Sequence, residues 1–284
     1  MRVLVTGGEG QVGSQFAPLL AAHECISLGH GQLDVTDEAE VHAALGSARP
    51  DLVIHCAAWT DVDGCEREPD RAHRVNAEGT RLVARGAADA GARLVYVSTD
   101  FVFDGAKGAP YDERDPTNPI NAYGRSKLAG EMHVRRLCPR HYIVRTAWLF
   151  GRSRSNFVAK VLSAARRQTR LRMAHDQLGS PTYVRDLAAQ IIKVVDGAPF
   201  RTYHVTNSGD ASRYEWACEI VRLAKLGVEV VPIPSSEWQT PAARPADSRL
   251  DNRALREAGI APMRLYKDAL AEVVPALLEM TDAG

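Results

Sequence analysis

Tyr123 and Lys127 are the residues whose types and spacing best suit proton transfer. They stand four positions apart in the stretch Asn121-Ala-Tyr-Gly-Arg-Ser-Lys127, so in a helix both side chains lie on one face and reach one substrate. A nearby ammonium favours the ionised form of a phenol and lowers its pKa, which makes the phenol a usable acid or base near neutral pH. The same spacing also occurs by chance on solvated helices, so the pair needs support from the rest of the chain.

A hydroxyl at the end of a predicted strand completes this group. Residues 93–98 predict the strand, and Thr99 follows it directly. A hydroxyl at a strand tip can hold a carbonyl oxygen that the phenol protonates. The alternative is a turn hydroxyl that bonds to local backbone.

A glycine-rich loop near the N-terminus predicts a dinucleotide site. The apolar run Val3-Leu-Val5 fits a strand that is covered on both faces, and it leads directly into the loop. The loop's glycines recur every three residues, which lets backbone N–H groups and a helix end approach a pyrophosphate: Gly7, Gly10, Gly13. An apolar stripe predicts the helix that follows: Val12, Phe16, Leu19, Leu20. A glycine-rich turn without a ligand is the alternative.

The end of the second predicted strand, 24–28, bears on the choice of cofactor. A carboxylate about 20 residues beyond such glycines normally accepts the ribose hydroxyls of NAD and repels a 2′-phosphate. Gly29-His30-Gly31 stands there instead, so we predict that NADPH is accepted, with NADH as a second cofactor. Asp34 is better placed beside the adenine, unless it caps the helix that begins near Asp37.

Strand and helix signals alternate through the first half of the chain. Apolar runs at 51–56 and 142–147 predict further strands, and 71–90 and the Tyr123 segment predict helices. This order predicts an α/β fold with a doubly wound parallel sheet. Ala57-Ala-Trp-Thr60 follows the third strand, where small residues leave room for a cofactor. Residues 105–120, rich in Gly, Pro, Asp and Asn, predict a loop of the length used for lids and binding elements.

Composition limits the partners of the protein. Of its 284 residues, 45% are hydrophobic and 25% charged, as in ordinary soluble globular proteins. Thirty-five basic side chains balance 35 acidic ones, which gives no electrostatic footprint for nucleic acid or a membrane surface. Five scattered cysteines without a C-x-x-C pair argue against a zinc site or a disulfide framework and favour a reducing cytoplasm. We expect no signal peptide and no membrane span, and small molecules or copies of the chain as partners.

The glycine loop and the Thr99, Tyr123 and Lys127 motifs resemble those of the extended short-chain dehydrogenases/reductases. Later motifs resemble the dTDP-4-dehydrorhamnose reductase family within that superfamily, in the same order over nearly the whole chain. They are Asp100-Phe-Val-Phe-Asp-Gly105, Arg145-Thr-Ala-Trp148, Asn156-Phe157, Asp176-Gln-Leu-Gly-Ser-Pro-Thr182 and Arg244-Pro-Ala-Asp-Ser-Arg249. The resemblance implies a Rossmann-like fold, NAD(P)H as cofactor and a dTDP-4-keto-6-deoxy sugar as substrate. It leaves open a homodimer and an Mg²⁺ ion whose site we do not locate, since no histidine cluster has the spacing of a catalytic metal site.

The resemblance also assigns residues to the two ligands. With His30 added from its place after the second strand, the expected cofactor residues are Gly7, Gly10, Gln11, Val12, Gly13, His30, Asp34, Val35, Ala58, Thr60, Tyr123 and Lys127. The expected substrate residues are Thr99, Asp100, Trp148, Asn156, Gln177, Arg244 and Arg249, of which the two arginines would face the diphosphate. Trp148 has a packing role as its alternative, and each arginine a surface ion pair.

One substitution distinguishes between the related reactions. The sugar-nucleotide 4,6-dehydratases carry Asp-Glu after the threonine, because elimination of water needs a second carboxylate. Here Phe101 follows Asp100, which argues against a dehydratase, whereas an epimerase is disfavoured only by the family motifs. Three hypotheses remain: the rhamnose-pathway reductase, a 4-ketoreductase for another dTDP-deoxysugar, and a non-catalytic NADP-binding regulatory subunit. Intact Thr99, Tyr123 and Lys127 argue against the third.

The second half of the chain predicts a smaller, mixed α/β substrate domain. Segments 155–166 and 187–195 predict helices, 201–205 predicts a strand, and the tail from 228 mixes a short strand, a Pro-rich loop and two helices. We expect a dinucleotide-binding domain at 1–148, to which part of 181–205 returns. The substrate domain is expected at 149–180 and 206–284.

Overall fold

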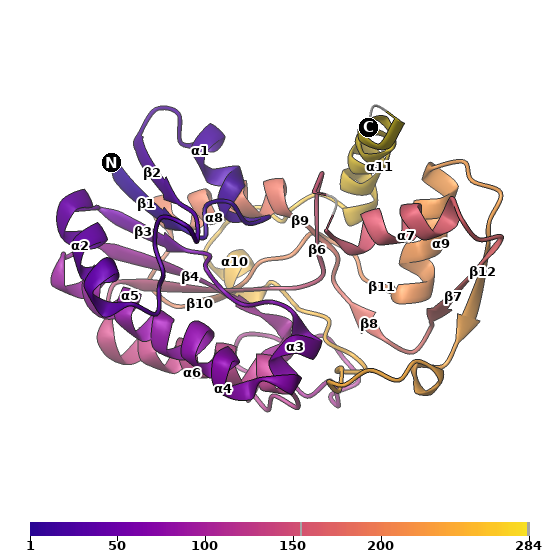
Figure 1. Cartoon of the computed structure of the whole chain (residues 1–284), viewed down its shortest axis with the longest axis horizontal. Helices are drawn as coiled ribbons and strands as arrows, with labels where there is room; N and C mark the ends of the chain where they lie inside the picture. Colours follow the sequence, from indigo (N-terminus) through magenta and orange to yellow (C-terminus); the bar gives the residue numbers. More distant parts are fainter. Residues whose placement is uncertain (154, 283–284) are drawn as a thin grey trace.

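A six-stranded parallel sheet forms the centre of the protein (Figure 1). The computed structural model describes residues 1–153 and 155–282. The strand order is β10-β5-β4-β3-β1-β2, and every neighbouring pair is parallel. The strands are β1 (Arg2–Thr6), β2 (Glu24–Leu28), β3 (Leu52–His55), β4 (Arg93–Thr99), β5 (His141–Thr146) and β10 (Thr202–His204). The predicted fold class, an α/β doubly wound parallel sheet, is confirmed.

Both faces of the sheet are buried, which is why its strands are apolar runs rather than alternating ones. Successive residues of β1 point to opposite faces: Val3 and Val5 belong to one apolar cluster and Leu4 to another. Helix α8 (Val184–Gly197) covers the first face with Leu187 and Ile191. The second face is covered by α2 (Glu38–Ala48), α5 (Gly79–Asp89) and α6 (Ala122–Leu137).

The remaining elements form smaller units beside the sheet. A parallel pair joins β7 (Arg170–Ala174) to β12 (Glu229–Ile233), and it lies with α7 (Phe157–Ala165) and α9 (Arg213–Leu223) at one end of the molecule in Figure 1. Two further pairs join β6 (Leu149–Phe150) to β9 (Thr182–Tyr183) and β8 (Leu178–Gly179) to β11 (Ala211–Ser212). The other helices are α1 (Phe16–Leu19), α3 (Val62–Arg67), α4 (Pro69–His73), α10 (Arg253–Glu257) and α11 (Tyr266–Asp282).

The structure also revises details of the predicted elements. The helix after the glycine loop is only a 3-10 turn at Gly13–Gln15 followed by α1, which contains Pro18, and Leu19 of the predicted stripe is exposed. The helix predicted at 71–90 is α4 and α5, joined by a π-helical turn at Arg74–Glu78. Sequence analysis missed α9. The division into two domains at the expected boundaries stays a prediction, although α8 and β10 do pack on the central sheet.

Candidate active site

A cavity at the carboxyl ends of the central strands brings the predicted catalytic residues together. Its volume is about 480 Å³, and its walls come from the glycine loop, from the segments that follow β3, β4 and β5, from α6 and from the start of α9. Open parallel sheets bind their ligands in this position. The predicted site residues that line it are Gly7, Gly10, Gln11, Val12, Gly13, Ala58, Thr60, Thr99, Asp100, Tyr123, Lys127 and Trp148.

Helix α6 presents Tyr123 and Lys127 from its first two turns. Asn121 caps the helix by accepting a hydrogen bond from Gly124 N at 2.8 Å, and it donates one to Ala243 O at 2.8 Å. This cap fixes where the helix begins, and therefore which face carries the pair.

Asn76 connects α6 to the segment that follows β3. It lies in the π-helical turn, accepts a hydrogen bond from Trp59 N at 2.8 Å and donates one to Ser126 Oγ at 3.0 Å. Two walls of the cavity are thus held together by one buried amide, and π turns are frequent at functional sites.

Thr99 ends β4 and directs its hydroxyl proton at Asp100. Its Oγ1 accepts a hydrogen bond from Phe101 N at 3.1 Å and donates one to Asp100 Oδ1 at 3.0 Å. Asp100 Oδ2 accepts a hydrogen bond from Ser248 Oγ at 2.6 Å. Burial raises the pKa of Asp100 to about 6, while the hydrogen bonds from Ser248 and Thr99 lower it. To donate to a substrate carbonyl, Thr99 must therefore give up its bond to Asp100.

Lys127 lines the cavity but is almost completely buried. Its Nζ donates a hydrogen bond to Val97 O at 2.8 Å and lies 4.1 Å from the centre of the Tyr96 ring. Burial lowers the pKa of Lys127 to about 7, against the charge of Glu131 one turn along α6, which raises it. Glu131 is itself held by Arg145 through hydrogen bonds of 2.8 and 2.7 Å.

The predicted effect of Lys127 on Tyr123 is wrong for this structure. Burial raises the pKa of the Tyr123 phenol above its usual range, hydrogen bonding with Thr99 lowers it, and the charge of Asp100 raises it. The Lys127 ammonium bonds to the Val97 carbonyl instead. The phenol is therefore held in its protonated form, which suits a proton donor.

The glycine loop fits a dinucleotide. Gly7 has a φ of +67°, and a Cβ there would lie 2.6 Å from Ala57 N; a Cβ on Gly13 would lie 2.2 Å from Gly7 O. Larger residues would therefore force the loop away from the sheet. Gln11 Oε1 is buried and has no hydrogen-bond partner in the described part of the chain, and Gln11 lines the cavity. Compact backbone and an unpartnered acceptor are the features that a bound dinucleotide uses.

The sequence predicts no carboxylate at the end of β2, where the cofactor ribose would lie, but the structure places one there. It belongs to Glu9 of the glycine loop, because a Cβ on Gly29 would lie 2.5 Å from the Glu9 carboxylate oxygens. His30 is exposed and Val35 is buried. Asp34 accepts hydrogen bonds from Thr36 N at 2.9 Å and Thr36 Oγ1 at 2.8 Å, which lower its pKa. None of these residues lines the cavity, so their contact with a cofactor stays a prediction.

Asp37, rather than Asp34, caps α2. Its carboxylate accepts hydrogen bonds from the backbone N–H groups of Ala39 and Glu40. The carboxylate of Asp34 is used by Thr36 instead, so the alternative that we kept open for it does not hold.

Trp148 faces the cavity from a strained backbone. Its φ is +45°, in the left-handed region that residues with a side chain rarely adopt. A Cβ on Gly179 would lie 2.1 Å from the indole Cε2, so the ring packs directly on this glycine. It also stacks on Trp216, with ring centres 5.5 Å apart. Strain of this kind is found at ligand sites, which favours the substrate role over packing alone.

The other predicted substrate residues do not line the cavity. Asn156 caps α7, and its side chain is hydrogen-bonded to Gly151 O, Ser153 O and Ala159 N. The backbone carbonyl of Gln177 accepts a hydrogen bond from Arg213 N. Arg244 forms an ion pair with Asp63, and Arg249 forms one with Asp247. Sequence reasoning missed Arg213, which does line the cavity. The signal available was Ser212-x-x-Glu215, which forms a capping box at the start of α9.

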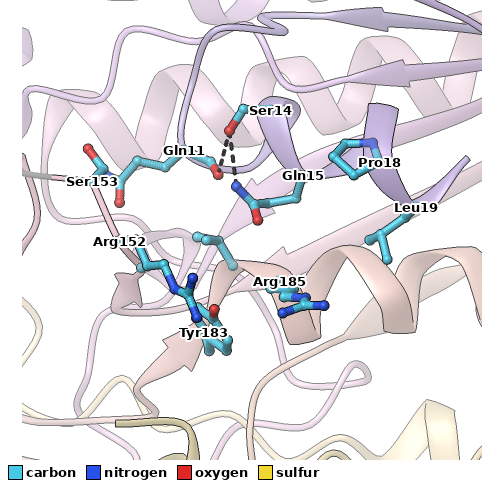
Figure 2. A pocket seen from close by; sticks show the side chains of 11 residues that line it. Gln11, Ser14, Gln15, Pro18, Leu19, Arg152, Ser153, Tyr183 and Arg185 are labelled. Atoms are coloured by element: carbon cyan, nitrogen blue, oxygen red, sulfur yellow. Dashed lines mark hydrogen bonds between the residues drawn. The ribbon is translucent and has the colours of Figure 1, made fainter. Parts of the chain in front are cut away.

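A second hollow lies beside the 3-10 turn and α1, which follow the glycine loop (Figure 2). It has a volume of about 490 Å³, with Gln11, Ser14 and Gln15 on the loop side and Arg152 and Arg185 opposite. Its lining contains no carboxylate.

Over residues 1–153 and 155–282 there is no group of three or more His, Cys, Asp or Glu that could hold a metal ion. The Mg²⁺ that sequence analysis left open is therefore not supported. Among the same residues, no helix is both long and apolar enough for a membrane span.

Comparison with known proteins gives matches over nearly the whole chain. A family model described as the RmlD substrate binding domain matches residues 1–279. A dTDP-4-dehydrorhamnose reductase of Streptomyces griseus is 42% identical over 97% of this chain and 94% of its own. A dTDP-4-keto-6-deoxy-D-glucose reductase of Streptomyces niveus is 39% identical over 97% of each chain. The crystal structure of a Bacillus anthracis dTDP-4-dehydrorhamnose reductase in complex with NADP has a TM-score of 0.93, at 39% identity over 96% of this chain and 98% of its own.

Proposed function

The chain belongs to the RmlD substrate binding domain family, and from that premise we propose that it reduces the C4 keto group of dTDP-4-dehydro-L-rhamnose with NADPH. The observation that carries the proposal is the shared cavity: Thr99, Tyr123 and Lys127 line it together with the glycine loop. The names of the similar Streptomyces griseus and Bacillus anthracis proteins support the substrate, and the NADP bound to the latter supports the cofactor.

The residues of the cavity can act on a ketone in a simple sequence. Bound NADPH would supply the hydride that adds to the carbonyl carbon. Tyr123 donates its phenolic proton to the carbonyl oxygen, and burial keeps that proton in place beforehand. Lys127, which Glu131 favours in its charged form, holds its ammonium on Val97 O and would have to turn toward Tyr123 to stabilise the phenolate that is left. One hydride and one proton convert the ketone to an alcohol.

The other substrate-side residues orient the sugar. Trp148 borders the deoxysugar with the part of its indole ring that Arg213 and Trp216 leave uncovered, and Asp100 presents a buried carboxyl group next to Thr99. Phe101, which follows Asp100, provides no second carboxylate, so these residues support reduction rather than elimination of water.

A specific observation supports a second candidate substrate. The similar Streptomyces niveus protein is named for dTDP-4-keto-6-deoxy-D-glucose, and its identity to this chain is close to that of the rhamnose-pathway relatives. Reduction of another dTDP-4-keto-6-deoxy sugar is therefore our alternative. A homodimer and a cytoplasmic location stay predictions from the sequence.

Steady-state kinetics would test the function. The enzyme should be supplied with NADPH and, separately, with dTDP-4-dehydro-L-rhamnose and dTDP-4-keto-6-deoxy-D-glucose, and NADPH absorbance followed. We expect the higher kcat/KM with the rhamnose precursor. The higher value with the glucose derivative would favour the alternative, and no turnover with either would contradict both.

A further inference from the structure

Arg213, the first residue of α9, brings a guanidinium without a polar partner to the cavity of Tyr123. Its Cζ lies 3.5 Å from the centre of the Trp148 ring and 5.0 Å from that of Phe157. Over residues 1–153 and 155–282, its side chain takes part in no hydrogen bond and no ion pair, only in these ring contacts, a third at 5.7 Å from the Trp216 ring centre, and longer-range charge interactions. The N–H donors at the edges of the stacked group therefore remain free for a ligand.

The charges around Arg213 make an anion favourable there. Burial lowers the pKa of Arg213 to about 10, Asp100 raises it and Arg244 lowers it. A partly desolvated guanidinium without a hydrogen-bond partner is unfavourable in the free protein, even with the attraction of Asp100, which exceeds the repulsion of Arg244. A bound anion would supply the missing partner and relieve the repulsion.

The two arginines that the sequence pointed to are already used. Arg244 makes two hydrogen bonds of 2.9 Å to Asp63, and Arg249 makes bonds of 2.8 and 2.6 Å to Asp247. Neither lines the cavity, whereas Arg213 and Lys127 are the cations of its described lining. Lys127 donates one hydrogen bond to Val97 O, whereas the Arg213 guanidinium donates none within residues 1–153 and 155–282.

The position of Arg213 is fixed from three sides. Ser212 and Glu215 form a capping box that sets the start of α9. Arg213 N donates a hydrogen bond to Gln177 O at 3.2 Å. Trp148 holds the guanidinium plane by stacking. A cation fixed before the ligand arrives loses little entropy on binding, which strengthens the contact.

We propose that Arg213 binds the diphosphate of the nucleotide-sugar substrate through the free edge of its guanidinium. The inference rests on the proposed function and adds a residue to it. The pyrophosphate of the cofactor is the other diphosphate in reach, but the glycine loop already provides its site. A purely structural role, in which Arg213 only packs on Trp148, is the remaining alternative.

Calorimetric binding of dTDP to the NADP⁺-saturated protein tests this proposal. In Arg213→Gln we expect the Kd for dTDP to rise about 10- to 100-fold, as for the loss of a charged hydrogen-bonded contact, with the Kd for NADP⁺ unchanged. In steady-state assays the same variant should raise KM for the dTDP-sugar and change kcat less than twofold. Arg222→Gln, on an exposed face of the same helix, is the matched control and should bind dTDP like the wild type.

Each other outcome overturns the proposal. An unchanged Kd for dTDP would leave Arg213 with a packing role, and a loss of NADP⁺ affinity alone would assign it to the cofactor. Arg213→Lys, which keeps the charge, decides the matter if Arg213→Gln does not fold: it should weaken dTDP binding at least threefold, and wild-type affinity would contradict the use of the planar guanidinium. Failure of the wild type to bind dTDP would instead refute the proposed function, and the inference with it.

Discussion

The buried ammonium of Lys127 should make the protein more stable as pH rises from 7. Burial lowers the pKa of Lys127 to about 7 in the folded state, from its ordinary value of 10.5. Between these values the unfolded chain binds more protons than the folded one, so the free energy of unfolding increases with pH. Integrating this difference gives a gain of about 1.6 kcal/mol between pH 7 and 8.5.

Other groups with shifted pKa values change the free energy of unfolding mainly outside the range from pH 7 to 8.5. Burial lowers the pKa of His55 and His204 to about 3, so they contribute below their ordinary range near 6.5. The pKa of Asp100 is raised from 3.8 to about 6, so this carboxyl group changes the free energy of unfolding between those two pH values. Burial raises the pKa of the thiols Cys56 and Cys65 from 9.0 to about 12, so they act mainly above pH 9.

Urea unfolding of the wild type and of Lys127→Met at pH 7 and 8.5 would measure the effect. Methionine fills a similar volume without a charge, so the variant should lack the extra 1.6 kcal/mol or so of pH dependence. It should also be more stable than the wild type at pH 7, because the cost of burying the ammonium is gone. Equal pH dependence in the two proteins would refute this account of Lys127.

Two further variants test the glycine loop and the packing of the Trp148 ring. Glu9→Gln removes the carboxylate at the end of β2. Because a charge that repels the 2′-phosphate is lost, the ratio of kcat/KM for NADPH to kcat/KM for NADH should rise about three- to tenfold. An unchanged ratio would place Glu9 away from the ribose. Gly179→Ala puts a Cβ 2.1 Å from the Trp148 ring, so it should raise KM for the dTDP-sugar and lower stability by about 1 to 3 kcal/mol. Gly197→Ala, whose Cβ meets nothing within 4 Å, is its control, and equal behaviour of the two variants would contradict the role of Gly179.

Much of the fold was predictable because it follows from local patterns. The apolar runs of β1 and β3 to β5 mark strands buried on both faces, and the helical stretches between them imply parallel crossovers. The Asn121 cap and the Tyr123 and Lys127 spacing lie within one helix, so the sequence alone places that pair on one face.

What the sequence could not predict depends on contacts between distant residues. Arg213 contacts Trp148, 65 positions away, and Arg244 forms an ion pair with Asp63, 181 positions away. No local motif therefore indicates that Arg244 is paired and that Arg213 lacks a polar partner. The acid at the end of β2 comes from Glu9 rather than from the strand itself. The direction of the Lys127 ammonium depends on the Val97 carbonyl of β4, which lies 30 residues away.

The most direct measurement of the central claim follows a deuterium atom in a single turnover. NADPH carrying deuterium at both C4 positions of its nicotinamide is mixed with wild-type enzyme and dTDP-4-dehydro-L-rhamnose, and the product is analysed by NMR. We predict one deuterium at C4 of the sugar, and a rate about 10²-fold lower in Tyr123→Phe. Tyr142→Phe, whose hydroxyl bonds to Ala198 O, should react at the wild-type rate. A sugar without deuterium, or a Tyr123→Phe variant as fast as the wild type, would contradict the account.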